Sequence, residues 1–395
     1  MGRVWGFGVS GGIGGGSASG VGLARRRRRR WVRGGALGVG GLVVVGAGVG
    51  WGVYLKLNGN ITADEAAARE LARYEKERPT ALVKGAQNIL VIGSDTRAGT
   101  GNRPYGRDNG TQRSDTTILL HLPAGRGSAT AVSIPRDLMV DVPSCLGPDG
   151  TRTSPAFTVF NHAFENGGSA CTVRTAEKLT DIRIDHHLVV DFNGFKKIVD
   201  ALDGVEICLA EPIHDKAAKL RLPAGRVKLD GEQALGYVRV RKSLGDGSDT
   251  ERMDRQQRFL AALVKKVRGN DVLLNPAKLY PVLDAATSSL TTDPGLASLR
   301  SLYDLVRGLR NIPTERVQFL TVPRESYVDD ANRDQLVEPA AERLFERLRT
   351  DTPVEVAQEK KSPEEKTPEK SAPGKGDASA EPTFRGNTAA EESCR

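Results

Sequence analysis

The sequence contains few of the residues on which several common enzyme classes depend. Its 395 residues include five histidines, four cysteines and three methionines, and aromatic residues make up 5% of the chain. No Cys-x-x-Cys pair and no histidine at a metal-ligand spacing occurs, which argues against a zinc site. Ser94 and Ser133 do not stand in Gly-x-Ser-x-Gly turns, and no Gly-Lys-Ser/Thr loop is present. A serine hydrolase and an ATP-dependent enzyme are therefore not indicated.

Acidic residues are absent from the first 56 positions, which contain nine basic residues. The formal net charge of the whole chain is +8, so residues 57–395 have a net charge of −1. The main part of the chain is thus nearly neutral, and the sequence does not predict a nucleic-acid partner. With 38% hydrophobic and 27% charged residues, the chain is predicted to be neither a polytopic membrane protein nor wholly disordered.

Charged residues are also absent from residues 34–55, which follow the basic run Arg25–Arg30 and Arg33. This segment is long enough to span a bilayer as one helix, which needs about 20 residues. The basic flank predicts that residues 1–33 form a cytoplasmic tail and that the chain from residue 56 onward lies outside. We therefore expect a single-pass protein of the cell membrane. A cleaved signal peptide is the alternative.

An even number of cysteines in an extracytoplasmic chain is compatible with two disulfide bonds. Cys145 and Cys171 flank a segment rich in Gly, Pro and Ser, so this pair is favoured, with Cys208 and Cys394 as the second. The alternative is that the cysteines are free thiols in a core. Beyond residue 351 the sequence is rich in Lys, Glu and Pro, so residues 351–395 are predicted to be a disordered tail. Residues 56–86 are predicted to be a stalk before a domain at residues 87–350.

Short apolar runs alternate with amphipathic stretches in this predicted domain, which favours an α/β layered fold. The predicted strands are Asn88–Ile92, Thr117–Leu122, Ala129–Ile134, His187–Asp191 and Val205–Leu209. The predicted helices are Val173–Thr180, Phe195–Leu202, Gly231–Tyr237, Met253–Val267, Pro294–Leu309 and Pro339–Arg349. Another helix is expected from a capping box at Thr62–Glu65 to about Glu77.

Charged side chains follow or precede several of these strands. Asp95 and Arg97 follow the first strand, Arg113 and Asp115 precede the second, and Arg136 follows the third. Ligands of open α/β sheets bind in crevices at strand ends. Further along the chain are Arg239, Arg241, Arg252 and Gln256. Several arginines with two carboxylates suit a phosphate-bearing polyanion bridged by a divalent metal.

In this order, the blocks resemble the LytR–CpsA–Psr family of cell-wall glycopolymer transferases. The segments that carry the resemblance are Asn88–Asp95, Arg113–Thr117, Ser133–Asp137, Asn161–Ala163, Val199–Val205, Leu229–Leu235 and Arg252–Gln257. The resemblance implies an α/β/α sandwich with a central mixed sheet and an apolar groove for a lipid. It also implies transfer of a phosphorylated glycan from a polyprenyl-pyrophosphate carrier to a peptidoglycan hydroxyl, assisted by Mg²⁺.

By motif position, the resemblance assigns Asp95 and Asp115 to the metal. It makes Arg136, Arg239 and Arg241 catalytic, and it assigns the remaining pyrophosphate contacts to Arg97, Arg113, Arg252 and Gln256. Asp95, Asp115 and Asp137 all remain candidates for the general base. A pyrophosphatase acting at the same site and a non-catalytic wall-polymer tether or transcription attenuator are the alternative functions.

Overall fold

In the computed structural model of the protein, residues 45–95, 113–216, 218–240, 249–269, 275–357 and 383–391 are described. The chain divides into two units, Met1–Lys56 and Leu57–Arg395. Residues 45–60 are helical. Within the described ranges, no helix combines the length and the apolar character needed to cross a membrane. Residues 34–44 of the predicted span, and the whole predicted tail at 1–33, lie outside the described residues.

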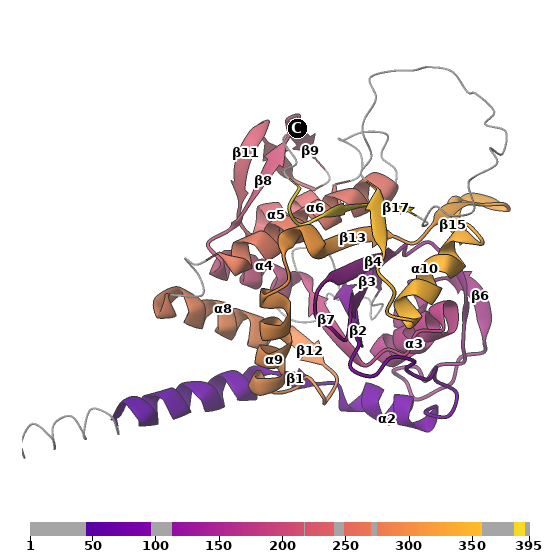
Figure 1. Ribbon diagram of the computed structural model, residues 1–395, viewed down its shortest axis with the longest axis horizontal. Coiled ribbons are helices and arrows are strands. Elements are labelled where there is room, and N and C mark those ends of the chain that lie inside the picture. Colours follow the sequence, from indigo (N-terminus) through magenta and orange to yellow (C-terminus); the bar gives the residue numbers. More distant parts are fainter. Residues whose placement is uncertain are drawn as a thin grey trace, which may run out of the picture. The chain divides into compact units, whose positions relative to one another are not determined.

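The second unit is built on a mixed sheet, which has nine strands among the described residues (Figure 1). The strand order is β1-β12-β7-β2-β3-β4-β13-β17-β16. The bounds are β1 Thr62–Ala63, β2 Gln87–Ser94, β3 Ser114–Leu122, β4 Ala129–Ile134, β7 His186–Asp191, β12 Leu290–Thr292, β13 Val317–Thr321, β16 Glu355–Ala357 and β17 Thr383–Thr388. Four predicted strands are confirmed here as β2, β3, β4 and β7. The fifth, Val205–Leu209, is confirmed as a strand but lies outside this sheet.

Four antiparallel two-stranded ribbons complete the described strands. They pair β5 Met139–Val142 with β6 Ala156–Val159, β8 Val205–Leu209 with β11 Gly225–Leu229, β9 Ile213–Asp215 with β10 Leu220–Leu222, and β14 Arg324–Tyr327 with β15 Asp330–Leu336. The β14–β15 hairpin lies between two of the predicted helices, Pro294–Leu309 and Pro339–Arg349, where the sequence analysis expects no strand. The hairpin is bound to the loop that follows β4, because the Asp334 amide donates a hydrogen bond to the Asp137 carbonyl at 3.1 Å.

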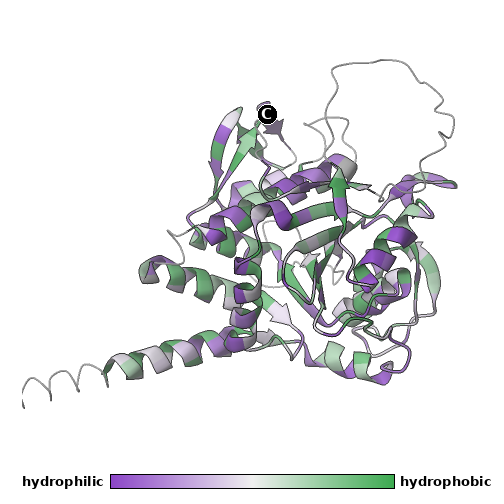
Figure 2. Cartoon of the chain, in the orientation of Figure 1, coloured by the Kyte–Doolittle hydropathy of each residue, from purple (hydrophilic) through white to green (hydrophobic). Residues whose placement is uncertain are grey.

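Helices cover both faces of the sheet, so the predicted α/β/α layering is confirmed. The helices are α2 Glu65–Arg73, α3 His162–Thr180, α4 Phe192–Ala201, α5 Gly231–Arg239, α6 Asp249–Arg268, α8 Pro276–Ser289, α9 Leu299–Arg310 and α10 Ala340–Arg349, with a short 3₁₀ turn at Thr314–Arg316. Side chains alternate across each strand. Leu90 therefore packs with α2, α3 and α10, whereas Ile89 packs with α6 and α9. In Figure 2 apolar residues recur along the central strands and along the helices that cover them.

A third apolar cluster lies between α4, α5, α6 and the β8–β11 ribbons. It contains Val199 of α4, Ala234 of α5 and Phe259 of α6. Because α6 contributes to both this cluster and the cluster under the sheet, it joins the small ribbons to the central layer. This helix also supplies several of the side chains discussed below.

The predicted stalk is wrong in part, because residues from 62 onward belong to the folded unit. Thr62 and Ala63 pair in parallel with β12, and Ala67 and Leu71 of α2 are in the main core. The helix begins after Asp64, which accepts a hydrogen bond from the Ala67 amide at 3.0 Å. The sequence pattern identifies the helix, but it does not show what lies against the apolar side of that helix.

The prediction of a disordered tail from residue 351 is also wrong at its two ends. Strand β16 pairs with β17, and β17 pairs antiparallel with β13 in the central sheet. Phe384 is buried in the main core and Ala389 in the cluster on the opposite face. Residues 358–382, between these strands, lie outside the described residues.

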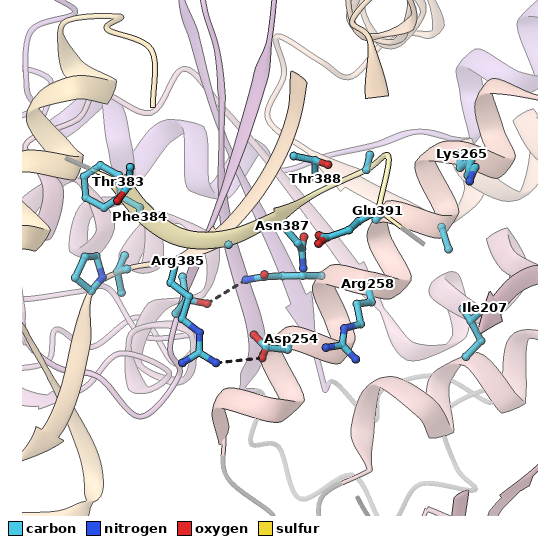
Figure 3. A pocket seen from close by; sticks show the side chains of 18 of the residues that line it. Ile207, Asp254, Arg258, Lys265, Thr383, Phe384, Arg385, Asn387, Thr388 and Glu391 are labelled. Atoms are coloured by element: carbon cyan, nitrogen blue, oxygen red, sulfur yellow. Dashed lines mark hydrogen bonds and ion pairs between the residues drawn. The ribbon is translucent and has the colours of Figure 1, made fainter. Parts of the chain in front are cut away.

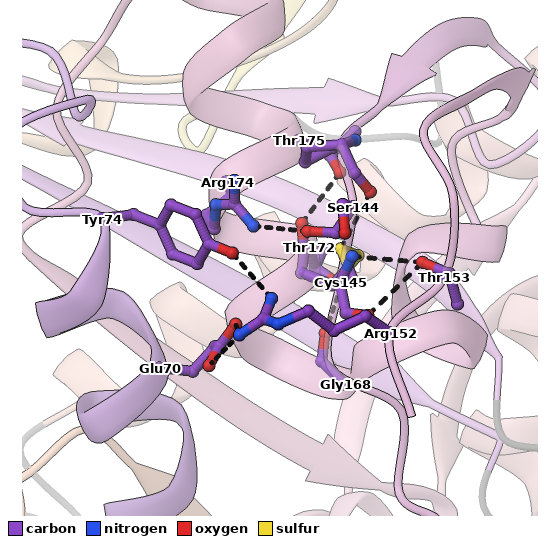
Figure 4. The surroundings of a disulfide bond; sticks show 12 residues. Glu70, Tyr74, Ser144, Cys145, Arg152, Thr153, Gly168, Thr172, Arg174 and Thr175 are labelled. Carbon is purple, nitrogen blue, oxygen red and sulfur yellow. Dashed lines mark hydrogen bonds and ion pairs between the residues drawn. A yellow bond between two sulfur atoms is a disulfide. The ribbon is translucent and has the colours of Figure 1, made fainter. Parts of the chain in front are cut away.

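The predicted disulfide between Cys145 and Cys171 is confirmed and connects the loop after β5 to α3 (Figure 4). Arg174 stacks on the ring of Tyr74, with its guanidinium carbon 3.4 Å from the ring centroid. Arg152, from the loop closed by the disulfide, donates to the Tyr74 hydroxyl at 2.6 Å. These contacts attach α2 to the disulfide loop. Cys208 is also disulfide-bonded. Its predicted partner, Cys394, lies outside the described residues.

The carboxyl group of Asp64 connects α2 to the sheet and to α3. It accepts from His187 of β7 at 3.4 Å and from Ser169 of α3. Burial alone would raise the pKa of this carboxyl. The hydrogen bonds from His187, Ser169 and the Ala67 amide outweigh burial and lower the pKa to about 2. At neutral pH the Asp64 carboxyl is therefore ionised in the folded protein and keeps these hydrogen bonds.

Candidate functional site

Four strands of the central sheet end at the same edge. Strands β2 and β7 are parallel to each other, as are β4 and β13, and β3 runs antiparallel to both β2 and β4. The carboxyl ends of β2, β4, β7 and β13 and the start of β3 therefore share one edge, called here the carboxyl edge. This is where open α/β sheets place their ligands. Asp95, Arg113, Asp115 and Arg136 all lie directly at these strand ends.

Asp95 and Arg113 are joined through the backbone of the β2–β3 pair. The Arg113 amide donates to Asp95 Oδ1 at 2.6 Å, and the Asp95 amide donates to the Arg113 carbonyl at 2.9 Å. The Arg113 side chain extends to Glu165 of α3, with 3.0 Å between Nε and Oε2. Glu165 is a contact that the sequence analysis missed, because no motif marks it. Arg97, the other predicted arginine of this turn, lies outside the described residues.

Arg136 lies between two carboxylates. Its Nη1 atom is 3.1 Å from Asp115 Oδ1 and its Nε atom is 3.1 Å from Asp137 Oδ2. The second oxygen of Asp137 lies 3.5 Å from Nη1 of Arg333, on β15. Charges of opposite sign thus alternate from Asp115 to Arg333. The side chain of Arg136 is 20% exposed, so its orientation is constrained while it stays accessible to a ligand.

Arg239 reaches the carboxyl edge from α5. Its guanidinium carbon lies 4.6 Å from the ring centroid of Phe192, the residue that follows β7. An arginine over an aromatic face at this distance makes a cation–π contact. The contact orients a guanidinium that is otherwise exposed at the end of its helix. Phe192 was not among the predicted site residues. Arg241, predicted to act beside Arg239, lies outside the described residues.

The first turns of α6 connect these elements. Gln256 donates through Nε2 to the Val238 carbonyl at 3.3 Å, one residue before Arg239. Gln257 donates to Ser133 of β4 at 3.3 Å and to Thr321 of β13 at 3.0 Å. Arg252 is only 5% exposed. In the described structure, Gln256 and Gln257 therefore hold α5, α6 and two strand ends together.

The predicted metal ligands are Asp95, which is hydrogen-bonded to the Arg113 amide, and Asp115, which lies two residues after Arg113. No group of three or more His, Cys, Asp or Glu side chains in the described parts of the chain could hold a metal ion. Mg²⁺ does not need such a group, because it usually keeps several waters and binds through one or two carboxylates and substrate phosphates. The buried hydroxyl of Ser114, between Arg113 and Asp115, has no hydrogen-bond partner among the described residues. The oxygen donors at this position suit a hard cation.

A cavity of about 1280 Å³ lies beside the carboxyl edge and is lined in part by α6 (Figure 3). The helix contributes Asp254, Gln257, Arg258 and Ala261, which recur every three or four residues and so share one helical face. Opposite α6, strand β17 forms a wall of the cavity, and Arg385 of that strand lies 4.0 Å from Asp254. Gln257 lines the cavity and also contacts both strand ends, so the cavity adjoins the carboxyl edge.

Comparison with known proteins extends these observations. The model of the LytR_cpsA_psr family matches residues 53–350. The probable cell wall biosynthesis protein LcpB of Corynebacterium glutamicum is 38% identical over 272 residues, which are 66% of this chain and 61% of that protein. The cell wall biosynthesis protein LcpA of the same organism is 32% identical over 60% of this chain and 50% of its own. This chain therefore spans less than two thirds of either relative's length.

A third relative is the polyisoprenyl-teichoic acid–peptidoglycan teichoic acid transferase TagT of Bacillus subtilis, which is 28% identical over 73% of this chain and 85% of its own. Among solved structures, a LytR-Csp2A-Psr enzyme from Actinomyces oris matches with a TM-score of 0.54 and 22% identity, over 69% of this chain and 93% of its own. TagT bound to LI-WTA matches with a TM-score of 0.51 and 24% identity, over 70% and 96%. At these identities the solved structures establish the fold alone.

Proposed function

Because the chain belongs to the LytR–CpsA–Psr family, we propose that it transfers a phosphorylated glycopolymer from a polyprenyl-pyrophosphate carrier to a hydroxyl of peptidoglycan. One observation carries the proposal. At one edge of the sheet, Arg136 is held between Asp115 and Asp137, next to the joined pair of Asp95 and Arg113. Arginines pair bidentately with phosphate oxygens, and carboxylates suit a cation bridging those oxygens.

The proposed reaction is a displacement at the phosphorus atom next to the glycan. The acceptor hydroxyl oxygen bonds to this phosphorus, the bond from phosphorus to the bridging oxygen breaks, and polyprenyl phosphate leaves with that electron pair. The hydroxyl proton passes to a carboxylate of the carboxyl edge, Asp95, Asp115 or Asp137. Such reactions require positioning and charge neutralisation rather than covalent work by the protein.

The charged residues have separate parts in this proposal. Arg136 is fixed in orientation by its two carboxylate partners and binds the phosphate oxygens on which negative charge develops. Arg113 and Arg239 bind the same pyrophosphate from the β3 and α5 sides. Asp95 and Asp115 would hold Mg²⁺, which when bound neutralises pyrophosphate charge. Gln256 acts as a positioning residue for Arg239, through the Val238 carbonyl.

The apolar side of the sheet suits the lipid part of the carrier. Val91, Leu120 and Leu188, from three adjacent strands, pack against the cluster under α6 and α9 but are only partly buried. Polyprenyl chains gain free energy by covering such surface, at about 25 cal/mol per Å². We further propose that residues 34–55 anchor the chain in the membrane that holds the polyprenyl carrier.

The test is a product analysis with the full-length protein in detergent. It is incubated with a lipid-linked glycan and nascent peptidoglycan, with Mg²⁺ or with EDTA. Glycan attached to peptidoglycan, in amounts that fall when EDTA is added, is the expected product. Free phosphorylated glycan formed equally well without peptidoglycan would make the protein a pyrophosphatase. Bound glycan with no bond cleavage would make it a tether.

A further inference from the structure

Helix α9 has an outer side that presents apolar side chains to solvent. Its sequence is LRSLYDLVRGLR, and its inner residues Leu305 and Leu309 pack against the apolar cluster under the sheet. None of its residues is fully buried. On the outer side, the side chain of Tyr303 is 61% exposed and that of Val306 is 49% exposed. The outer side of an ordinary surface helix is polar or charged, so this pair calls for a partner.

The same outer side of α9 is basic. Arg307 and Arg310 follow Tyr303 by four and seven residues, so the three side chains share one face of the helix. Both arginines are exposed, and neither forms an ion pair with any residue that the structure describes. The third arginine of the helix is Arg300, and its acidic residue is Asp304. Three arginines and one aspartate give α9 a formal charge of +2, which suits an anionic partner.

The start of α9 is joined to the segment through which the chain enters the second unit. The Leu299 amide donates to Asn58 Oδ1 at 3.0 Å, and Asn60 Nδ2 donates to Oδ1 of Asp284, on α8, at 3.0 Å. Leu57 is 2% exposed. Strand β1, which follows this segment, pairs with β12, the strand before α9 (Figure 1). Residues 57–60 are therefore fixed to α8 and α9 within the second unit.

This segment begins directly after the predicted membrane span. The span ends at residue 55 and residues 45–60 are helical, so Asn58 lies about 5 Å further along the helix axis. Trp51 and Tyr54, near that end, are exposed, and their ring centroids are 5.6 Å apart. Tryptophan and tyrosine are enriched at the interface between membrane and water. With residues 34–55 in the membrane, as proposed above, the start of α9 lies close to the surface of the bilayer.

We propose that the outer side of α9 binds the surface of the membrane in which the chain is anchored, and that its partner there is the headgroup layer of anionic phospholipids. Tyr303 and Val306 enter the interfacial layer, and Arg307 and Arg310 pair with lipid phosphate groups. The inference rests on the proposed anchor at residues 34–55 but not on the transfer reaction. An anchor and a bound helix together restrict how the second unit can turn on the bilayer.

The experiment measures tryptophan fluorescence of the full-length protein in vesicles of phosphatidylcholine with phosphatidylglycerol, and in vesicles of phosphatidylcholine alone. Tyr303→Trp adds a fluorescent side chain to α9, and brominated phospholipids quench tryptophan that enters the bilayer. The signal is the extra quenching relative to wild type, which has three tryptophans. The matched probe is Phe157→Trp. Phe157 of β6 is 54% exposed, and the β5–β6 ribbon packs on the other face of the sheet from α9.

Two pairs of substitutions are made in the Tyr303→Trp protein to test the charge. Arg307→Gln/Arg310→Gln removes both arginines from the outer side of α9. The matched control is Arg343→Gln/Arg347→Gln, which removes the same charge from α10, a helix that packs on the opposite face of the sheet. All proteins are compared at the salt concentration that halves the extra quenching of Tyr303→Trp.

The expected result is extra quenching of Tyr303→Trp in vesicles that contain phosphatidylglycerol, and none for Phe157→Trp. Raised salt should weaken this quenching, because it screens the attraction between arginines and lipid phosphates. A basic side chain near an anionic bilayer strengthens binding by a factor of about five. Loss of two arginines should therefore lower the ratio of bound to unbound helix by about 25-fold and remove nearly all the extra quenching. The α10 control should keep it.

Three results would overturn the inference. The first is the absence of extra quenching in Tyr303→Trp. The second is equal quenching in both kinds of vesicle, which would exclude anionic headgroups as the partner. The third is a shift of Tyr303→Trp emission in detergent as the protein concentration rises, which would assign the outer side of α9 to a second copy of the chain.

Flotation with the vesicles and resistance to alkaline extraction test the anchor separately. Protein that resists extraction but shows no extra quenching keeps the anchor and loses the α9 inference. Quenching in protein that alkali extracts would overturn the anchor and support the binding of α9 to the bilayer. Quenching does not require catalysis, so a negative result leaves the proposed transfer reaction in place.

Discussion

Replacing Arg136 tests the carboxyl edge most sharply, because this side chain touches two carboxylates and faces the proposed pyrophosphate. Arg136→Ala removes a donor from the place where negative charge develops, and such losses cost about 3–4 kcal/mol, or roughly 10²–10³ in rate. Its ion pairs with Asp115 and Asp137 are part-exposed, so the free energy of unfolding should fall by only about 1 kcal/mol. Activity should thus fall far more than stability.

Arg136→Lys refines this prediction. Lysine keeps the positive charge, but its single ammonium group cannot reproduce the two separate contacts of Nε and Nη1. We expect an intermediate loss of roughly tenfold in transfer rate, since the charge stays and the fixed orientation is lost. The matched control is Arg300→Ala, an exposed arginine of α9.

The assay is the initial rate of glycan transfer to peptidoglycan, measured together with urea unfolding of each variant. Arg136→Ala with a rate within about twofold of wild type would refute the reasoning. A fall in rate that Arg300→Ala reproduced would also refute it, because the effect would then be one of net charge. A loss of stability as large as the loss of activity would assign Arg136 to folding instead.

Three further predictions concern the fold and the site. Asp64→Asn should lower the free energy of unfolding by about 2 kcal/mol at pH 7 and by little near pH 2. A carboxyl whose pKa is about 2 instead of 3.8 stabilises the fold above pH 4, and this contribution is lost as the pH falls toward 2. Urea unfolding at both pH values measures the difference, and an equal loss at the two pH values would contradict the assignment. Replacing Cys145 and Cys171 with serine should cost about 3.5 kcal/mol under non-reducing conditions, from the closure entropy of a 26-residue separation. An unchanged melting temperature would show that the bond does not stabilise the fold. Phe192→Leu should raise the KM for the carrier roughly two- to fivefold with little change in kcat, because it removes a cation–π contact of about 0.5–1 kcal/mol to Arg239; an unchanged KM would argue against that contact.

The sequence predicts the central strands well because they are short, apolar and mostly buried on both faces. All five predicted strands lie within about three residues of the observed bounds. Prediction of strands from the sequence fails where a strand is stabilised by partners far along the chain. Strand β17, with the sequence TFRGNT, has no apolar run of its own and is held by pairing with β13. Two residues of β1 form a strand only because β12 lies beside them.

The same division applies to the candidate site. Asp95, Arg113, Asp115 and Arg136 follow or precede apolar strands, so their convergence at one edge could be predicted. Glu165 and Arg333 could not be predicted, because α3 and β15 approach the edge only in the folded chain. Phe192 was missed for another reason. An aromatic residue after a strand is usually interpreted as a core residue. Only the distance between the Phe192 ring and the Arg239 guanidinium reveals the cation–π contact.

The most direct measurement of the central claim follows the phosphorus atom next to the glycan. A carrier labelled with ³²P at this position alone is incubated with the full-length protein and peptidoglycan, and the label is located after digestion of the wall polymer. The account predicts that the label is recovered in a phosphodiester between glycan and peptidoglycan, while unlabelled polyprenyl phosphate is released. Label recovered on the lipid, or only on soluble glycan, would contradict it.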